Sequence, residues 1–237
     1  MIKVIDVDYS PLSYLGHCAG ICYGQRNPNR YKAIAESCIL SEHDRVEEFP
    51  TITMEISEYS AKAIRDIYTH IIGTTRLGSS TRYIDYSKGF DFSIPPSVLA
   101  DPKATKVWCE HMNAVDNAMS ELKLMDIPVE DFTGLLPLAY HHTIVLKINL
   151  RALVHMFHVR SCTLAYHECR ELMKEIKKTI LDLEDVEWTW IANNLFVPKC
   201  KFRLYCTENK NRSCGLMPNR EDVEALVKGF KEVKDGR

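Results

Sequence analysis

The stretch that decides the fold is residues 64–86, IRDIYTHIIGTTRLGSSTRYIDY. It begins as a helix that starts at Ser60, because apolar residues recur at the helical period from Ile64 to Ile71. At Gly73 the helix gives way to a small, polar and cationic run: Thr74, Thr75, Arg76, Leu77, Gly78, Ser79, Ser80, Thr81, Arg82 and Tyr83. Short hydroxyl donors and guanidinium groups fit phosphate oxygens, so this run predicts a phosphate-binding loop. The alternative is an ordinary Ser/Thr-rich turn between a helix and a strand.

The composition is that of a soluble globular protein. The chain has 237 residues, of which 46% are hydrophobic and 26% charged, enough for one large domain or two small ones. A net charge of −2 argues against a surface that coats nucleic acid. No apolar run approaches the roughly 18 residues that a membrane span needs. The first residues lack a charged-then-apolar secretion signal, so we expect a cytoplasmic protein with its nine cysteines as thiols.

The sequence predicts both strands and helices. Strands are expected at residues 3–8, 51–56 and 143–148, and helices at residues 30–40, 60–71, 106–124, 129–136, 162–183 and 220–231. The helix at 106–124 has a predicted core stripe: Val107, Met112, Val115, Ala118, Met119 and Leu122. These elements predict an α+β fold with a mixed or antiparallel sheet and long helices.

Residues 149–160, NLRALVHMFHVR, form the second informative stretch. Asn149 is a suitable N-cap. The predicted core side of this helix carries Leu150, Leu153, Val154 and Phe157. Its polar edge carries Arg151, His155 and His158 at i, i+4 and i+7, and Arg160 projects from the end. A polar face turned to water explains the same spacing without any ligand.

The C-terminal stretch contains Cys200, Cys206 and Cys214 at irregular gaps. Three cysteines this close can bind zinc if a fourth ligand comes from elsewhere, but the sequence identifies none. Buried thiols in a small lobe are the other interpretation. The Cys18–Cys22 gap does not match a zinc knuckle, and small residues packed at a helix contact explain residues 15–23 better. No metal site is assigned from the sequence.

Both informative stretches resemble the signatures of flavin-dependent thymidylate synthases. His70 stands at the motif histidine, and Ser80, Arg82 and Tyr83 match the Ser-x-Arg-Tyr end. The dodecamer resembles the family's Asn-x-Arg-x-Leu-x-x-Phe-x-x-x-Arg segment, and the spacing of His43, Glu48 and Phe49 resembles a flavin-contacting element. The resemblance covers about residues 1–185. We therefore expect a family domain at 1–197 and a cysteine-containing extension packed on it at 198–237.

The resemblance implies roles for individual residues. FAD would be bound by His43, His70, Ile71, Asn149, Arg151 and His155. The nucleotide dUMP would be bound by Thr69, Gly78, Ser79, Ser80, Thr81, Arg82 and Arg160. Arg160 would also be catalytic, because a guanidinium beside the uracil ring favours its N3-deprotonated form.

The implied activity is reductive methylation of dUMP to dTMP. Methylenetetrahydrofolate would donate the carbon, reduced FAD the hydride, and NADPH would reduce FAD again. The resemblance also implies a homotetramer with sites at subunit contacts, small-molecule substrates, and neither nucleic acid nor membrane as a partner.

Four positions depart from the family pattern. Thr69, Ile71 and Thr133 stand where arginines are common, and Gly78 stands where Glu or Gln is common. Replacement charge is available from Arg45, Arg76 and Lys147. Two alternatives therefore stay open: a related flavoenzyme that modifies C5 of another pyrimidine nucleotide, and a non-catalytic nucleotide-binding paralogue.

Overall fold

The computed structural model describes residues 1–235, and the side chains of residues 1–228. The chain forms two compact units. Unit 1 comprises Met1–Val7 and Thr51–Ile148, and unit 2 comprises Asp8–Pro50 and the chain from Asn149 onward. Each unit is therefore assembled from segments that are far apart in the sequence. A separate C-terminal extension from residue 198 stays a prediction.

Unit 1 is built on a four-stranded sheet with strand order β1-β2-β4-β3. The strands are β1 (Ile2–Val7), β2 (Thr51–Ile56), β3 (Thr74–Gly78) and β4 (Ile144–Asn149). β1 pairs with β2, and β3 with β4, both antiparallel. This arrangement confirms the α+β prediction and the three predicted strands.

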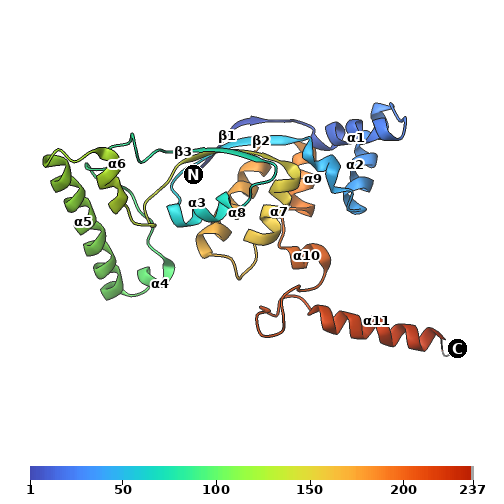
Figure 1. Cartoon of the computed structure of the whole chain (residues 1–237). Coiled ribbons are helices and arrows are strands. Elements are labelled where there is room, and N and C mark those ends of the chain that lie inside the picture. Colours follow the sequence, from blue (N-terminus) through green and yellow to red (C-terminus); the bar gives the residue numbers. More distant parts are fainter. Residues whose placement is uncertain (236–237) are drawn as a thin grey trace. The chain divides into compact units, whose positions relative to one another are not determined.

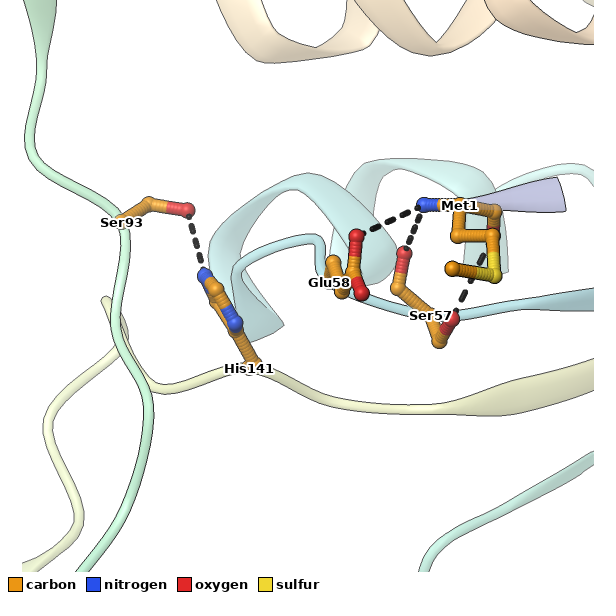
Figure 2. Close-up of polar contacts among 5 residues, drawn as sticks. All are labelled: Met1, Ser57, Glu58, Ser93 and His141. Carbon is orange, nitrogen blue, oxygen red and sulfur yellow. Dashed lines mark hydrogen bonds and ion pairs between the residues drawn. The ribbon is translucent and has the colours of Figure 1, made fainter.

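The sheet buries alternate residues, as the period of two predicts. In β2 and β4 the buried positions are Ile52, Met54, Ile56, Ile144, Leu146 and Ile148. The start of β1 is fixed to the end of β2, because the Met1 ammonium group donates to the Ser57 carbonyl at 2.7 Å and pairs with Glu58 at 3.5 Å (Figure 2). Elsewhere in the unit, the Ser93 hydroxyl lies 3.3 Å from Nε2 of His141 (Figure 2).

Two helices of unit 1 begin within one residue of their predicted starts at 60 and 129, and a third begins at Pro102, four residues before its predicted start at 106. α3 (Ala61–Tyr68) begins after Ser60, whose hydroxyl accepts from the Ala63 amide at 3.1 Å. The others are α4 (Pro96–Leu99), α5 (Pro102–Leu124), α6 (Val129–Phe132) and the 3-10 turn η3 (Thr133–Leu135). Figure 1 shows α4, α5 and α6 grouped at one end of this unit.

The predicted core stripe of α5 is only partly buried. Met112 and Met119 are buried, whereas Val107 is 67% exposed. Val115, Ala118 and Leu122 are half-buried. The predicted core stripe is therefore wrong at Val107, and only Met112 and Met119 of its other residues are fully buried. Periodicity identifies the apolar side of a helix but not what covers that side.

Unit 2 is mainly helical. Its N-terminal segment contains α1 (Pro11–Cys22), η1 (Pro28–Arg30), α2 (Tyr31–Leu40) and η2 (Asp44–Glu48). Its C-terminal segment contains α7 (Leu150–Arg160), α8 (His167–Leu181), α9 (Val186–Asn194), α10 (Lys199–Arg203) and α11 (Arg220–Asp235). α1 packs on α2 and α9, while α7 contacts η2, α8 and α10. Within residues 1–235 no helix has the length and apolar character needed to cross a membrane.

The α1–α2 contact explains the small residues predicted at residues 15–23. A Cβ on Gly16 would lie 1.8 Å from the Tyr31 carbonyl oxygen, so the two backbones touch. Any side chain there would force the helices apart. The small-residue interpretation is confirmed at this position.

The predicted helix at 162–183 begins later than expected. α7 ends at Arg160 and α8 starts at His167, so Cys162 lies in the turn between them. Arg170 holds this turn, because its Nη1 donates to the carbonyls of Thr163 at 2.9 Å and Ala165 at 2.6 Å. Side-chain bonds to backbone carbonyls five and seven residues earlier leave no periodic signal in the sequence.

Candidate active site

The start of α7 is fixed by local bonds. The Asn149 side chain accepts from the Ala152 amide at 2.9 Å, and the Leu150 amide donates to the Pro50 carbonyl at 2.8 Å. The buried face is the predicted one: Leu150, Leu153, Val154 and Phe157. The structure thus confirms the N-cap and the orientation of this helix.

The opposite edge of α7 presents Arg151 and His155, both exposed. Arg151 Nη1 bonds to Glu48 Oε1 at 2.6 Å, and Nη2 lies 3.9 Å from Asp44 Oδ2. Both carboxylates belong to η2. The Arg151 side chain remains 46% exposed, so its guanidinium is accessible to an anionic ligand despite these pairs.

A buried carboxyl group lies behind this edge. Glu47 is only 6% exposed. Burial, reinforced by the neighbouring Asp44 charge and opposed by Arg151, raises the Glu47 pKa to about 7. No sequence pattern indicates this burial, because the residues around Glu47 are charged and are typical of a solvated loop.

His43 immediately precedes η2 and is exposed. Its amide donates to the Cys38 carbonyl at 2.9 Å, which closes α2. The side chain lines a cavity of about 370 Å³ together with Tyr23, Arg30 and Ser41. His43 thus lies at the start of η2, whose first and last residues, Asp44 and Glu48, both pair with Arg151.

The C-terminal end of α7 is partly covered. The His158 ring lies 5.0 Å from that of Phe202 in α10, and burial lowers the His158 pKa to about 4, helped by the positive charge of His155. His158 is therefore half-buried and does not share the exposed edge predicted for it. Arg160 is also half-buried and lines a cavity of about 350 Å³.

In unit 1, the predicted phosphate-binding run begins as a strand. Thr74–Gly78 forms β3, with Arg76 opposite Leu146 of β4. The Arg76 guanidinium lies 4.8 Å from the Tyr68 ring centre, and its Nη1 donates to the His70 carbonyl at 3.2 Å. The loop prediction was wrong for these five residues, because strand pairing outweighs their polar composition.

The loop itself starts at Ser79. The Ser79 amide donates to the Thr143 carbonyl at 2.8 Å, and the Ser80 hydroxyl accepts from the Arg82 amide at 3.3 Å. The Thr133 hydroxyl donates to the Thr81 carbonyl at 2.7 Å. Thr133, at a position where arginine is common in the resembled family, therefore fixes this loop to α6.

Arg82 points to α6 as well. Its Nε lies 2.9 Å from Oε2 of Glu130, in a pair whose side chains are 66% and 52% exposed. An exposed pair of this kind contributes only about 0–1 kcal/mol, so an anion can replace the carboxylate.

Thr69, His70 and Ile71 lie at the other end of β3. The Thr69 hydroxyl donates to the Asp66 carbonyl at 2.7 Å, which closes α3. His70 is buried, whereas Ile71 is 70% exposed. The backbone carbonyl of His70 accepts from the Thr74 hydroxyl at 2.7 Å and from Arg76 Nη1 at 3.2 Å.

A hydroxyl–imidazole cluster covers Gly78. Nδ1 of His142 lies 2.8 Å from the Tyr140 hydroxyl and 3.1 Å from the Ser79 hydroxyl. Burial lowers the His142 pKa and raises that of Tyr140 to about 12, so both stay neutral near pH 7. Sequence reasoning missed His142, Tyr140 and Tyr68, which have no family motif or spacing to mark them.

This cluster explains why glycine stands at position 78. A Cβ there would lie 2.6 Å from both His142 Nε2 and Tyr68 Oη. We expect Gly78→Ala to destabilise the protein by about 1–3 kcal/mol in urea unfolding, because the neighbouring rings must move. Gly134→Ala is the matched control, since a Cβ at Gly134 meets nothing within 4 Å. Equal unfolding midpoints for the two variants would contradict the packing explanation.

Comparison with known proteins identifies the family. A family model described as "Thymidylate synthase complementing protein" matches residues 3–183. The flavin-dependent thymidylate synthase of Nitratidesulfovibrio vulgaris is 27% identical over 214 residues, covering 84% of this chain and 82% of the relative. That of Pyrococcus abyssi is 26% identical over 236 residues, covering 92% of both chains. That of Geobacter sulfurreducens is 31% identical over 139 residues, covering 58% of this chain and 60% of the relative.

A solved structure supports the fold. Thymidylate Synthase X from Helicobacter pylori, crystallised with FAD and dUMP, aligns with a TM-score of 0.66 at 17% identity, covering 83% of this chain and 99% of that one. At this identity the likeness concerns the fold alone. Together with the family match across residues 3–183, it leads to one conclusion: the chain belongs to the thymidylate synthase complementing protein family, that of the flavin-dependent thymidylate synthases.

Proposed function

We propose that this protein methylates C5 of dUMP to form dTMP, with methylenetetrahydrofolate as carbon donor, reduced FAD as hydride donor and NADPH as the reductant of FAD. The observation that carries the proposal is the cationic edge of α7. Arg151 and His155 are exposed on it, Arg160 ends it, and the family match includes all three. The relatives' names and the FAD and dUMP in the Helicobacter pylori structure agree with this assignment.

FAD is assigned to His43, Asn149, Arg151 and His155, with His70 and Ile71 contributed by this or another subunit. The residues present fit the cofactor, because an exposed guanidinium and imidazole on one helix edge suit its pyrophosphate. Asn149 acts through its cap, which fixes the start of that edge. Bound and reduced, the flavin supplies the hydride, while the chain orients it.

The nucleotide phosphate is assigned to the loop Ser79–Arg82, with Gly78 and Thr69 beside it. Ser80, Thr81 and Arg82 offer two hydroxyls and a guanidinium within three consecutive residues. The turn around Ser80 and the Thr133 bond to Thr81 fix the backbone of this loop. A preorganised loop loses little conformational freedom when it binds phosphate.

Arg160 is assigned to the uracil ring. Its permanent positive charge stabilises negative charge on the ring when N3 loses its proton. That charge reaches C5 through conjugation and makes C5 able to accept the one-carbon unit. Because Arg160 is half-buried, its charge is less screened than that of an exposed arginine.

The remaining expectations belong to the same proposal. The active form would be a homotetramer in the cytoplasm, in which loops of different subunits complete each site. Folate and dUMP would be its small-molecule substrates.

The direct test is turnover. Purified protein is incubated with dUMP, methylenetetrahydrofolate and NADPH, and dTMP is quantified by mass spectrometry. We expect dTMP only when all three are present. FAD-loaded protein that leaves dUMP unchanged would contradict the proposal.

One observation favours a second candidate, a flavoenzyme acting on another pyrimidine nucleotide. Gly78 stands where Glu or Gln is common in the family, and Thr133 stands where arginine is common. Each position is fixed by close contacts in this structure. These two replacements would give a nucleotide pocket that differs from the one common in the family. Turnover of a different pyrimidine nucleotide in the same assay, without turnover of dUMP, would favour this candidate.

The pair between Arg82 and Glu130 gives a further prediction. Because the Glu130 carboxylate competes with phosphate for Arg82, Glu130→Gln should bind dUMP about two- to five-fold more tightly by isothermal titration calorimetry. Glu110→Gln is the control, since Glu110 also forms an exposed pair, with Lys106 at 3.7 Å, but on α5. Weaker dUMP binding in Glu130→Gln would show that Glu130 positions Arg82 and does not compete with the phosphate.

A further inference from the structure

Four cysteines line one cavity in unit 2. The cavity has a volume of about 350 Å³, and Cys162, Cys200, Cys206 and Cys214 all contribute to its wall. They come from three places: the turn after α7, the segment that contains α10, and the loop that precedes α11. The sequence identifies no fourth ligand to join Cys200, Cys206 and Cys214. In the structure, Cys162 lines the same cavity and is the candidate for that fourth ligand.

The chain fixes these segments to one another by contacts independent of the cysteine thiols. α10 packs against α7. The Cys206 amide donates to the Pro218 carbonyl at 2.7 Å, and the Arg220 amide donates to the Cys206 carbonyl at 3.3 Å. The loop between Cys206 and Pro218 is thereby closed at its base.

Cys214 is directed toward the same turn that carries Cys162. The Leu216 amide and the Thr163 hydroxyl both form hydrogen bonds to the Cys214 sulfur. Gly215 has a φ of +78°, a conformation that suits glycine and turns the following amide back toward the sulfur. Thiolates that bind metals commonly accept such amide hydrogen bonds.

The four sulfurs are near enough to influence one another. Cys200 interacts electrostatically with Cys206, Cys162 and Cys214. As the side chains stand, no three His, Cys, Asp or Glu residues among those described are arranged to hold a metal ion. Ligation therefore requires side-chain rotations, which staggered χ1 alternatives allow for cysteine.

The charges around the cavity suit a thiolate-bound cation. Four thiolates and one Zn²⁺ carry a net charge of 2−, by 4 × (−1) + 2. The same wall contains the cations Arg160, Lys199 and Arg212, against one acidic residue, Glu208. Soft thiolate ligands in sets of four are typical of structural zinc sites.

We propose that Cys162, Cys200, Cys206 and Cys214 bind one zinc ion, which fastens the C-terminal segment to the end of α7. The ion cross-links the turn after Arg160 to the loop before α11. It thus fixes the backbone that carries Arg160. The site is structural, because four protein ligands leave no open position for substrate.

The first test is the metal content of the purified full-length protein. Inductively coupled plasma mass spectrometry is expected to find one zinc per chain after dialysis against a metal-free buffer. Titration of the wild-type protein with an organomercurial should then release that zinc in proportion to thiols modified. Less than a tenth of a zinc per chain, or stoichiometric iron with acid-labile sulfide, would overturn the proposal.

The second test assigns the ligands. Cys162→Ser and Cys214→Ser are each expected to reduce bound zinc at least ten-fold. Cys109→Ser and Cys22→Ser are the matched controls, half-buried and exposed respectively, and both should retain full zinc. His158→Ala should also retain it, although His158 lines the same cavity. Zinc unchanged in the two test variants, or lost from His158→Ala, would overturn the four-cysteine assignment.

The test is independent of the proposed enzyme activity, because zinc content is measured without substrate. Wild-type protein that contains zinc but makes no dTMP would refute the function and leave the metal site intact. The cobalt-substituted protein supplies a second signature, since tetrahedral thiolate coordination gives Co²⁺ intense visible absorption. Weak visible absorption, as octahedral Co²⁺ gives, would contradict coordination by the four cysteines.

Discussion

Arg160→Ala is expected to lower kcat for dTMP formation about 100- to 1,000-fold while the protein keeps its FAD. The guanidinium is assigned to stabilise negative charge that develops on the uracil ring. Its removal therefore affects the transition state more than substrate binding, and KM for dUMP should change less than kcat. Steady-state kinetics measure kcat and KM, and the flavin absorbance of the same preparation measures the bound FAD.

Arg203→Ala is the matched control for this variant. Arg203 is an exposed cation at the end of α10 that contributes, like its neighbours, to the positive charge near His158. Its removal should leave kcat within about two-fold, because an exposed charge is screened. Equal kcat values for Arg160→Ala and wild type would remove Arg160 from the reaction. Loss of zinc or FAD along with activity would instead indicate a structural role.

Glu47→Gln is expected to stabilise the protein above neutral pH, by up to about 3 kcal/mol. The Glu47 pKa is about 7 in the folded protein, compared with an ordinary value of 4.5. The folded state therefore keeps a proton that the unfolded state loses. The stability that this proton provides is fully present below about pH 4.5 and is lost as pH rises to about 7.

Urea unfolding at about pH 5 and about pH 8 measures the effect. The free energy of unfolding of the wild type should fall relative to that of Glu47→Gln between these two pH values, because glutamine does not titrate. Glu48→Gln is the control. The Glu48 carboxylate is exposed and bonded to Arg151, so removing its charge should lower the free energy of unfolding by about 0–1 kcal/mol at both pH values. A gap between wild type and Glu47→Gln that is independent of pH would show that Glu47 does not titrate in this range.

The sequence predicted the elements whose cause is local. The alternation of residues 51–56 predicts β2 with its bounds, Ser60 is predicted as a helix start, and Asn149 is predicted as an N-cap. Each of these depends on neighbouring residues, through side-chain period or a bond to an amide two or three residues away. The core face of α7 followed from the same kind of signal.

The errors have causes that side-chain periodicity does not show. Thr74–Gly78 is a strand because β4 pairs with it, although its composition is that of a loop. The turn before α8 depends on Arg170, and the partial burial of His158 depends on α10. Periodicity cannot reveal a partner that lies 40 or more residues away in the chain, such as Phe202 for His158.

The residues of the candidate site also divide into those that the sequence identifies and those that only the fold brings together. Motif resemblance selected Arg151, His155 and Arg160, which the structure leaves exposed or half-buried on α7. It did not select Glu47, His142 or Tyr140, whose altered pKa values result from burial by distant segments. The four cysteines around one cavity also required the fold, because Cys162 is 38 residues from Cys200 in the numbering.

The most direct measurement of the central claim is the visible absorption spectrum of the purified protein, loaded with FAD, desalted and titrated with dUMP. The polar edge of α7 is proposed to bind FAD, and the loop at Ser80 and Arg82 is proposed to bind a uracil nucleotide. We predict one flavin per chain after desalting and a saturable change of the flavin bands as dUMP binds. A protein that retains no flavin, or a flavin spectrum that dUMP leaves unchanged, would contradict the claim.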